Sequence, residues 1–64
     1  MTGREFRKLR LRLGLTQESL GKRMGVRANT IWRWEAGRLA VPRIAALAMK
    51  AILHEEGLRG RTGR

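Results

Sequence analysis

The sequence contains no cysteine and no aspartate, and it has only one histidine and one proline. Without cysteine, neither a disulfide nor a thiolate-bound metal ion can hold the fold together. Without aspartate, and with His54 as the single imidazole, the chain cannot assemble a nucleophile and its base. We therefore expect no enzyme activity, no catalytic residues, no cofactor and no metal site.

Long hydrophobic runs are missing as well. The longest stretch without a charged residue, residues 44–49, is far too short to span a bilayer. Near the N-terminus, residues 6–13 mix apolar side chains with Arg and Lys, unlike a signal peptide. We therefore expect a cytoplasmic protein that does not enter membranes.

Negative charge is scarce, whereas positive charge is abundant. Fifteen Lys and Arg residues stand against five acidic residues, all Glu, and the formal net charge is +10. Such an excess favours a polyanionic partner, with nucleic acid as the first candidate and an anionic membrane surface as the second. A membrane-active peptide would need a continuous amphipathic helix, which three glycines and Pro42 interrupt. Nucleic acid, and hence association with the nucleoid, is the favoured interpretation.

Helix signals recur along the chain. Thr2 and Glu5 have the spacing of a capping box, which predicts a helix that runs on to Gly14. Three further helical segments are marked at their ends in the same way, by N-cap residues, glycines and the single proline. These further helices are predicted at residues 17–24, at residues 28–35, and from Pro42 up to Gly57.

The pattern as a whole predicts an all-α fold, because no strand-like alternation and no internal repeat is present. We expect a compact four-helix domain over residues 1–56, without a second domain. Residues 57–64 are mostly Gly, Arg and Thr, and this composition predicts a flexible basic tail.

The fourth predicted helix is apolar on two sides. One side is expected to be the core stripe: Ile44, Leu47, Ala48 and Ala51. The other side is the candidate dimer surface: Ala46, Met49 and Leu53. A helix that is apolar nearly all round is normally covered on both sides, so we expect a homodimer, with loose packing against the tail as the alternative.

Residues 16–37, TQESLGKRMGVRANTIWRWEAG, carry the functional signal. Two short helices joined by a tight turn must cross closely, and Gly21 leaves room for that approach. Gly25 permits the positive φ of the turn. Apolar residues that fix the crossing follow at the required spacing: Leu20, Val26, Ile31 and Trp34.

This segment resembles the helix-turn-helix of the phage repressor and Cro family, also called the XRE family. The similarity extends over residues 6–52 and includes Glu35 and Gly37 beyond the two helices. The resemblance implies a phosphate contact by Gln17 and a structural pair between Arg10 and Glu35. It also implies that four residues face the DNA bases: Arg27, Ala28, Asn29 and Arg33.

Helix geometry agrees with the last assignment. With Ile31 inward, Asn29 and Arg33 lie about 160° and 200° away, so both point outward. Arg33 suits guanine and Asn29 suits adenine, whereas the alternative is an ordinary solvated helix face. The expected contacts to the DNA backbone are Thr16, Gln17, Trp32, Arg38 and Arg43.

The chain also departs from the family pattern. Arg27 stands where Ser or Thr usually caps the recognition helix, so we expect that cap to be lost. Trp32 is bulky for the edge of a groove, and it is expected either to lie against the DNA backbone or to be exposed without a task. The family's usual fifth helix is not predicted.

The sequence thus predicts a transcriptional regulator of the Cro-repressor or controller type that binds double-stranded DNA sequence-specifically. It would bind a pseudo-palindromic operator as a homodimer, with two recognition helices about 34 Å apart. The alternative is an antitoxin-type protein that binds a protein partner and uses DNA binding for autoregulation. No small-molecule ligand is expected.

Overall fold

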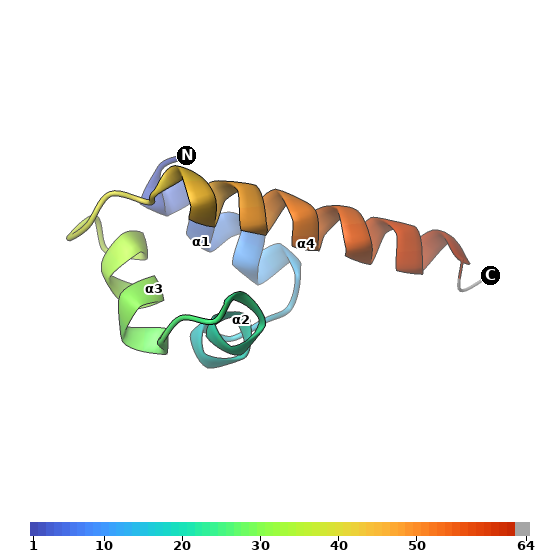
Figure 1. Ribbon diagram of the computed structural model, residues 1–64, viewed down its shortest axis with the longest axis horizontal. Coiled ribbons are helices and arrows are strands. Elements are labelled where there is room, and N and C mark those ends of the chain that lie inside the picture. Colours follow the sequence, from blue (N-terminus) through green and yellow to red (C-terminus); the bar gives the residue numbers. More distant parts are fainter. Residues whose placement is uncertain (63–64) are drawn as a thin grey trace.

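The computed structural model describes residues 1–62, which form four α-helices and no strand. Their bounds are α1 Gly3–Arg12, α2 Gln17–Met24, α3 Ala28–Glu35 and α4 Arg43–Thr62. Helix α4 lies along α1, and its C-terminal half extends beyond the other three helices (Figure 1). The predicted all-α class is confirmed. Within residues 1–62, no helix combines the length and hydropathy that crossing a bilayer requires.

The predicted caps of the first two helices are present. The Glu5 backbone N–H donates to Thr2 Oγ1 at 3.1 Å, and the Thr2 N–H donates to Glu5 Oε1 at 2.8 Å. This second bond is the main reason why the pKa of the exposed Glu5 carboxyl is lowered. Thr16 caps α2 by accepting from the Ser19 N–H at 3.0 Å. Gly25, with φ of +79°, turns the chain from α2 into α3.

One apolar core joins all four helices. Phe6 of α1, Leu20 of α2, Ile31 of α3 and Met49 of α4 are fully buried. The Trp34 ring packs edge-on against Phe6, with ring centroids 5.4 Å apart. The core therefore holds the inward side of α3 in place.

Two glycines allow backbone to approach backbone. A Cβ on Gly21 would lie 2.5 Å from the Val26 carbonyl oxygen, as the sequence motif predicts. A Cβ on Gly3 would overlap the Trp34 carbonyl oxygen, so the first turn of α1 sits directly against the end of α3. Sequence reasoning missed Gly3, because its neighbour in space lies more than thirty residues away in the chain.

The predicted core stripe of α4 is wrong. Ile44 is 77% exposed and Leu47 is 54% exposed, Ala51 is exposed, and Ala48 is only half-buried. The buried residues of α4 are instead Ala45, Met49 and Ile52. The reason is that α4 is apolar nearly all round, so its spacing alone did not determine which side meets the core.

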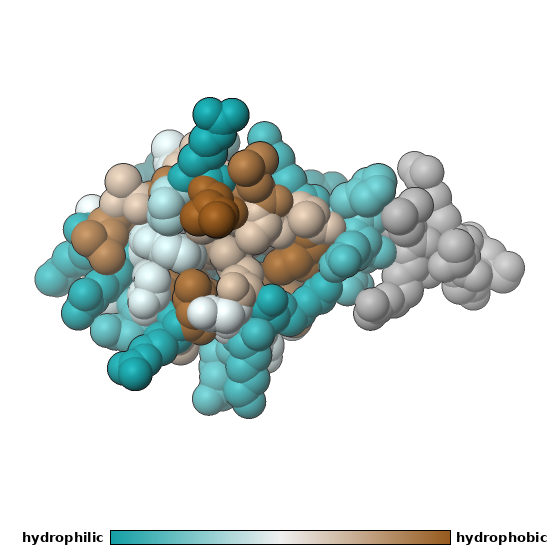
Figure 2. Space-filling model, in the orientation of Figure 1, coloured by the Kyte–Doolittle hydropathy of each residue, from teal (hydrophilic) through white to brown (hydrophobic). Residues whose placement is uncertain are grey.

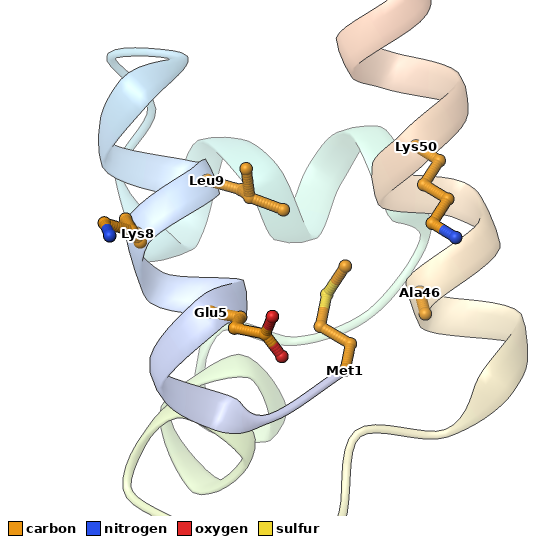
Figure 3. A pocket seen from close by; sticks show the side chains of 6 residues that line it. All are labelled: Met1, Glu5, Lys8, Leu9, Ala46 and Lys50. Atoms are coloured by element: carbon orange, nitrogen blue, oxygen red, sulfur yellow. The ribbon is translucent and has the colours of Figure 1, made fainter.

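The predicted dimer surface is wrong for the same reason. Met49 is fully buried in the core, and Leu53 is partly buried against it. Ala46 is half-buried and lines a groove between α4 and α1. In Figure 3 the Met1 side chain lies in this groove, with Lys8 and Lys50 on opposite sides. Met49 is therefore not available to a second copy, and Ala46 and Leu53 are only partly exposed.

Helix α4 is longer than predicted. It continues through Gly57 and Gly60 to Thr62, because a glycine inside a helix costs only about 1 kcal/mol and does not force an end. Arg23 of α2 donates to Glu55 and Glu56 at 3.3 and 3.1 Å and so ties α2 to the second half of α4. The predicted flexible tail is therefore helical over residues 57–62, and residues 63–64 lie outside the described part.

Candidate nucleic-acid interface

Helix α3 has two opposite sides. Ile31 and Trp34 are buried, whereas Asn29 and Arg33 are exposed. The prediction that Asn29 and Arg33 point outward is confirmed. Ala28, at the start of the helix, is half-buried. The helix thus exposes one polar side, while its opposite side is packed in the core.

The start of α3 lacks a side-chain cap, as predicted. Arg27 takes the extended N-cap conformation, with φ −79° and ψ 151°, but makes no capping hydrogen bond. Its side chain is exposed. The first N–H groups of α3 consequently keep their partial positive charge, and the residue directly before them is itself a cation. This end of the helix suits a negatively charged partner.

Glu35 is the centre of a buried hydrogen-bond cluster. Arg10 donates from Nε to Glu35 Oε2 at 2.7 Å and from Nη2 to Oε1 at 3.0 Å. The third guanidinium nitrogen, Nη1, donates to the Leu15 carbonyl at 2.9 Å. The Arg10 and Glu35 side chains are only 9% and 4% exposed. The predicted structural pair is therefore present, and it joins α1 to the end of α3.

Gln17 joins the same cluster, which sequence reasoning did not predict. Its Nε2 donates to Glu35 Oε1 at 3.1 Å, and the residue is half-buried at the first position of α2. Among the described residues, no buried side-chain nitrogen or oxygen lacks a partner. The Glu35 carboxylate thus holds side chains from α1 and α2 beside the C-terminal end of α3.

Trp32 and Arg38 form a second unpredicted pair. The Arg38 guanidinium carbon lies 5.5 Å from the centre of the Trp32 ring, within the range of a cation–π contact. Trp32 is 44% exposed. The Arg38 N–H donates to the Arg33 carbonyl at 2.8 Å, so the turn after α3 folds back on the helix. That turn depends on Gly37, at φ +77°, which was the available sequence signal.

A shallow basin connects these groups. It lies between α1, α2 and α3, and its lining residues are Arg7, Arg10, Gln17, Trp32, Glu35 and Ala36. Arg7, an exposed residue of α1, was not among the predicted site residues. Three of the residues predicted to contact the DNA backbone therefore lie in one region. Gln17 and Trp32 line the basin, and Arg38 packs on the Trp32 ring.

The other two residues that were predicted to contact the DNA backbone, Thr16 and Arg43, do not line this basin. Thr16 is exposed, but its hydroxyl caps α2 and lies 2.9 Å from the Ser19 hydroxyl. Arg43 is exposed as the first residue of α4. DNA contacts by all five residues stay a prediction.

Comparison with known proteins identifies the family of the chain. An uncharacterized HTH-type transcriptional regulator of Acanthamoeba polyphaga mimivirus is 40% identical over 57 residues, which are 89% of this chain and 25% of that protein. A UPF0251 protein of Pyrococcus furiosus is 63% identical over 35 residues, which are 52% of this chain and 32% of that protein. The chain therefore spans about a quarter to a third of these relatives, and no solved structure matches it significantly. The helix-turn-helix domain family matches residues 2–53, most of the chain, and the chain belongs to that family.

Proposed function

We propose that this chain is a sequence-specific DNA-binding transcriptional regulator that inserts α3 into the major groove of duplex DNA. The observation that carries the proposal is the two-sided α3: its back is buried in the core, and Asn29 and Arg33 are exposed. Membership of the helix-turn-helix domain family, the net charge of +10 and a relative named as a regulator support it. Regulation of the Cro-repressor or controller type, by blocking or recruiting polymerase, is the mode we favour.

Base recognition falls to the outward side and the N-terminus of α3. The Arg33 guanidinium can donate two hydrogen bonds to guanine, and the Asn29 amide can form two with adenine. Arg27 and Ala28, at the N-terminus of α3, also face the bases in this proposal. The uncapped N–H groups of α3 add positive charge at this end of the helix. Each correct pairing discriminates against other bases by about 1–3 kcal/mol.

Phosphate contacts fix the register of the protein on DNA. We assign them to Thr16, Gln17, Trp32, Arg38 and Arg43. Arg38 is held against the Trp32 ring, which limits its motion before DNA arrives. These contacts carry no sequence information and depend strongly on salt.

Selection of binding sites from random duplexes, repeated at two salt concentrations, tests this proposal. With Arg33→Ala we expect the selected sequence preference to flatten at one position, at a cost of about 1–3 kcal/mol on the best site. With Arg38→Ala we expect all duplexes to bind more weakly by a similar factor, with a salt slope lower by about one. If Arg33→Ala weakened every duplex equally, base recognition by Arg33 would be refuted.

A second copy of this chain is the partner that we propose for α4. Ile44, Leu47 and Ala51 are exposed at helical spacing, and Figure 2 shows hydrophobic surface over the first half of α4. The stripe is small against the roughly 1,200–2,000 Å² that stable interfaces bury. Two copies of charge +10 also repel each other. We therefore expect pairing on DNA, where phosphates neutralise the charge, and monomers in solution.

Cooperative binding to a duplex with two half-sites tests this pairing. Leu47→Glu should abolish cooperativity and leave binding to a single half-site intact. Leu11→Glu is a matched control, because Leu11 of α1 is 52% exposed and lies outside the stripe. Equal cooperativity in Leu47→Glu and the parent protein would exclude this surface as the dimer contact.

A further inference from the structure

The buried cluster around Glu35 does more than hold helices together. The Gln17 amide has two N–H donors, and Nε2 uses one of them on Glu35 Oε1 at 3.1 Å. Glu35 is itself fixed by two bonds from Arg10. The orientation of the Gln17 amide is thereby set from inside the protein.

We propose that Glu35 is a positioning residue that fixes the Gln17 amide so that its second N–H is presented to a DNA phosphate. This inference rests on the proposed function. Gln17 is the first residue of α2 and lines the basin between α1, α2 and α3 together with Arg7 and Trp32. An amide that is already oriented loses less conformational entropy when it binds a phosphate than a freely rotating one.

The charge of Glu35 makes this a sharp proposal. A carboxylate near DNA repels the phosphates, so simple electrostatics predicts tighter binding when it is removed. Positioning predicts the opposite sign. In Glu35, both oxygens already accept hydrogen bonds from Arg10, so the carboxylate is neutralised locally while it still orients Gln17.

The first experiment uses the free protein and needs no variant. The chain contains one Gln and one Asn, so side-chain amide NMR signals belong to Gln17 and Asn29 alone. The ¹H–¹⁵N heteronuclear NOE of the Gln17 side chain should approach that of the helical backbone, whereas the exposed Asn29 should give a much lower value. Equal mobility of the two amides would overturn the proposal.

The second experiment removes the positioning group and preserves the fold. Replacing a buried ion pair by apolar residues of similar size is often neutral for stability, so Arg10→Met is combined with Glu35→Met. This double variant keeps the net charge, and we expect it to bind the selected duplex about tenfold more weakly, like Gln17→Ala alone. Adding Gln17→Ala to the double variant should cause no further loss of affinity, since the double variant has already lost the oriented amide that Gln17→Ala removes.

Two readouts separate positioning from other roles. If the double variant folds and binds like the parent, the cluster is structural only and the proposal is overturned. If the double variant loses affinity for DNA in addition to the loss caused by Gln17→Ala, and its salt slope falls by about one, Arg10 contacts phosphate directly. The proposal is then also overturned. If the parent protein itself prefers no duplex sequence, the proposed function fails, whereas the NMR result still decides how Gln17 is held.

Discussion

Helices α3 and α4 make an instructive pair. In α3, the polar residues Asn29 and Arg33 lie on the exposed side. The apolar residues Ile31 and Trp34 lie on the opposite, buried side, so the sequence alone indicates which side meets the core. In α4, apolar residues occur nearly all round over residues 44–53, and the single charged residue there, Lys50, does not by itself determine which side meets the core. A helix orientation can be derived from sequence only where polar residues oppose apolar ones.

The way each helix is anchored also differs. The end of α3 is joined to α1 by the buried Arg10–Glu35 pair and by the backbone contact at Gly3. The buried side of α4 contributes the apolar side chains Ala45, Met49 and Ile52, and its ion pairs with Arg23 are partly exposed. Substitutions in the two regions should therefore destabilise the fold by different mechanisms.

The largest effect is expected from Arg10→Ala. Removing this guanidinium leaves the Glu35 carboxylate buried without a cation, and it also leaves the Leu15 carbonyl without a donor. We expect a loss of about 3–5 kcal/mol in the free energy of unfolding. Chemical denaturation measures it, and a loss below 1 kcal/mol would contradict the buried cluster.

The next effect compares the two sides of α4. Met49→Ala should cost about 2–5 kcal/mol, because it leaves a cavity in the core. Leu47→Ala, on the exposed side, should change stability by less than about 0.5 kcal/mol. Thermal unfolding of both variants measures the difference. Equal losses would mean that α4 is rotated from the orientation described above.

These two variants mark the limit of what could be predicted. The helix-turn-helix, the caps at Thr2 and Thr16, and the Arg10–Glu35 pair followed from spacing and from the family resemblance. The orientation of α4 did not, because several apolar positions compete for one core. The contacts of Gln17 with Glu35 and of Trp32 with Arg38 depend on how helices and turns meet in space, which residue spacing does not report.

A smaller effect concerns the start of α3. Arg27→Ser supplies the missing N-cap and should stabilise the fold by about 0.5–2 kcal/mol. The same change removes a cation from the proposed interface, so DNA binding should weaken with a lower salt slope. Stability and affinity would then move in opposite directions. Arg12→Ser, on the exposed last residue of α1, is the control for loss of charge alone.

The smallest effect is the pH dependence of the first cap. The pKa of Glu5 is lowered from 4.5 in the folded protein, mainly by the Thr2 N–H. The stabilisation by the Glu5 carboxylate is therefore fully present above the ordinary pKa of this carboxyl and is lost as the pH falls through the lowered value. Stability curves from pH 6 to pH 2 should be flatter for Glu5→Gln than for the parent protein. Identical curves would show that the charge of the Glu5 carboxylate contributes nothing to the cap.

The two tryptophans of α3 give the protein a pair of built-in optical probes. Trp34 is 6% exposed and Trp32 is 44% exposed, so we expect Trp34 to emit from an apolar environment and Trp32 from a partly solvated one. Iodide quenching in solution should reach Trp32 and spare Trp34. In a Trp34→Phe variant, the remaining fluorescence would report directly on the outer edge of α3, without an attached dye.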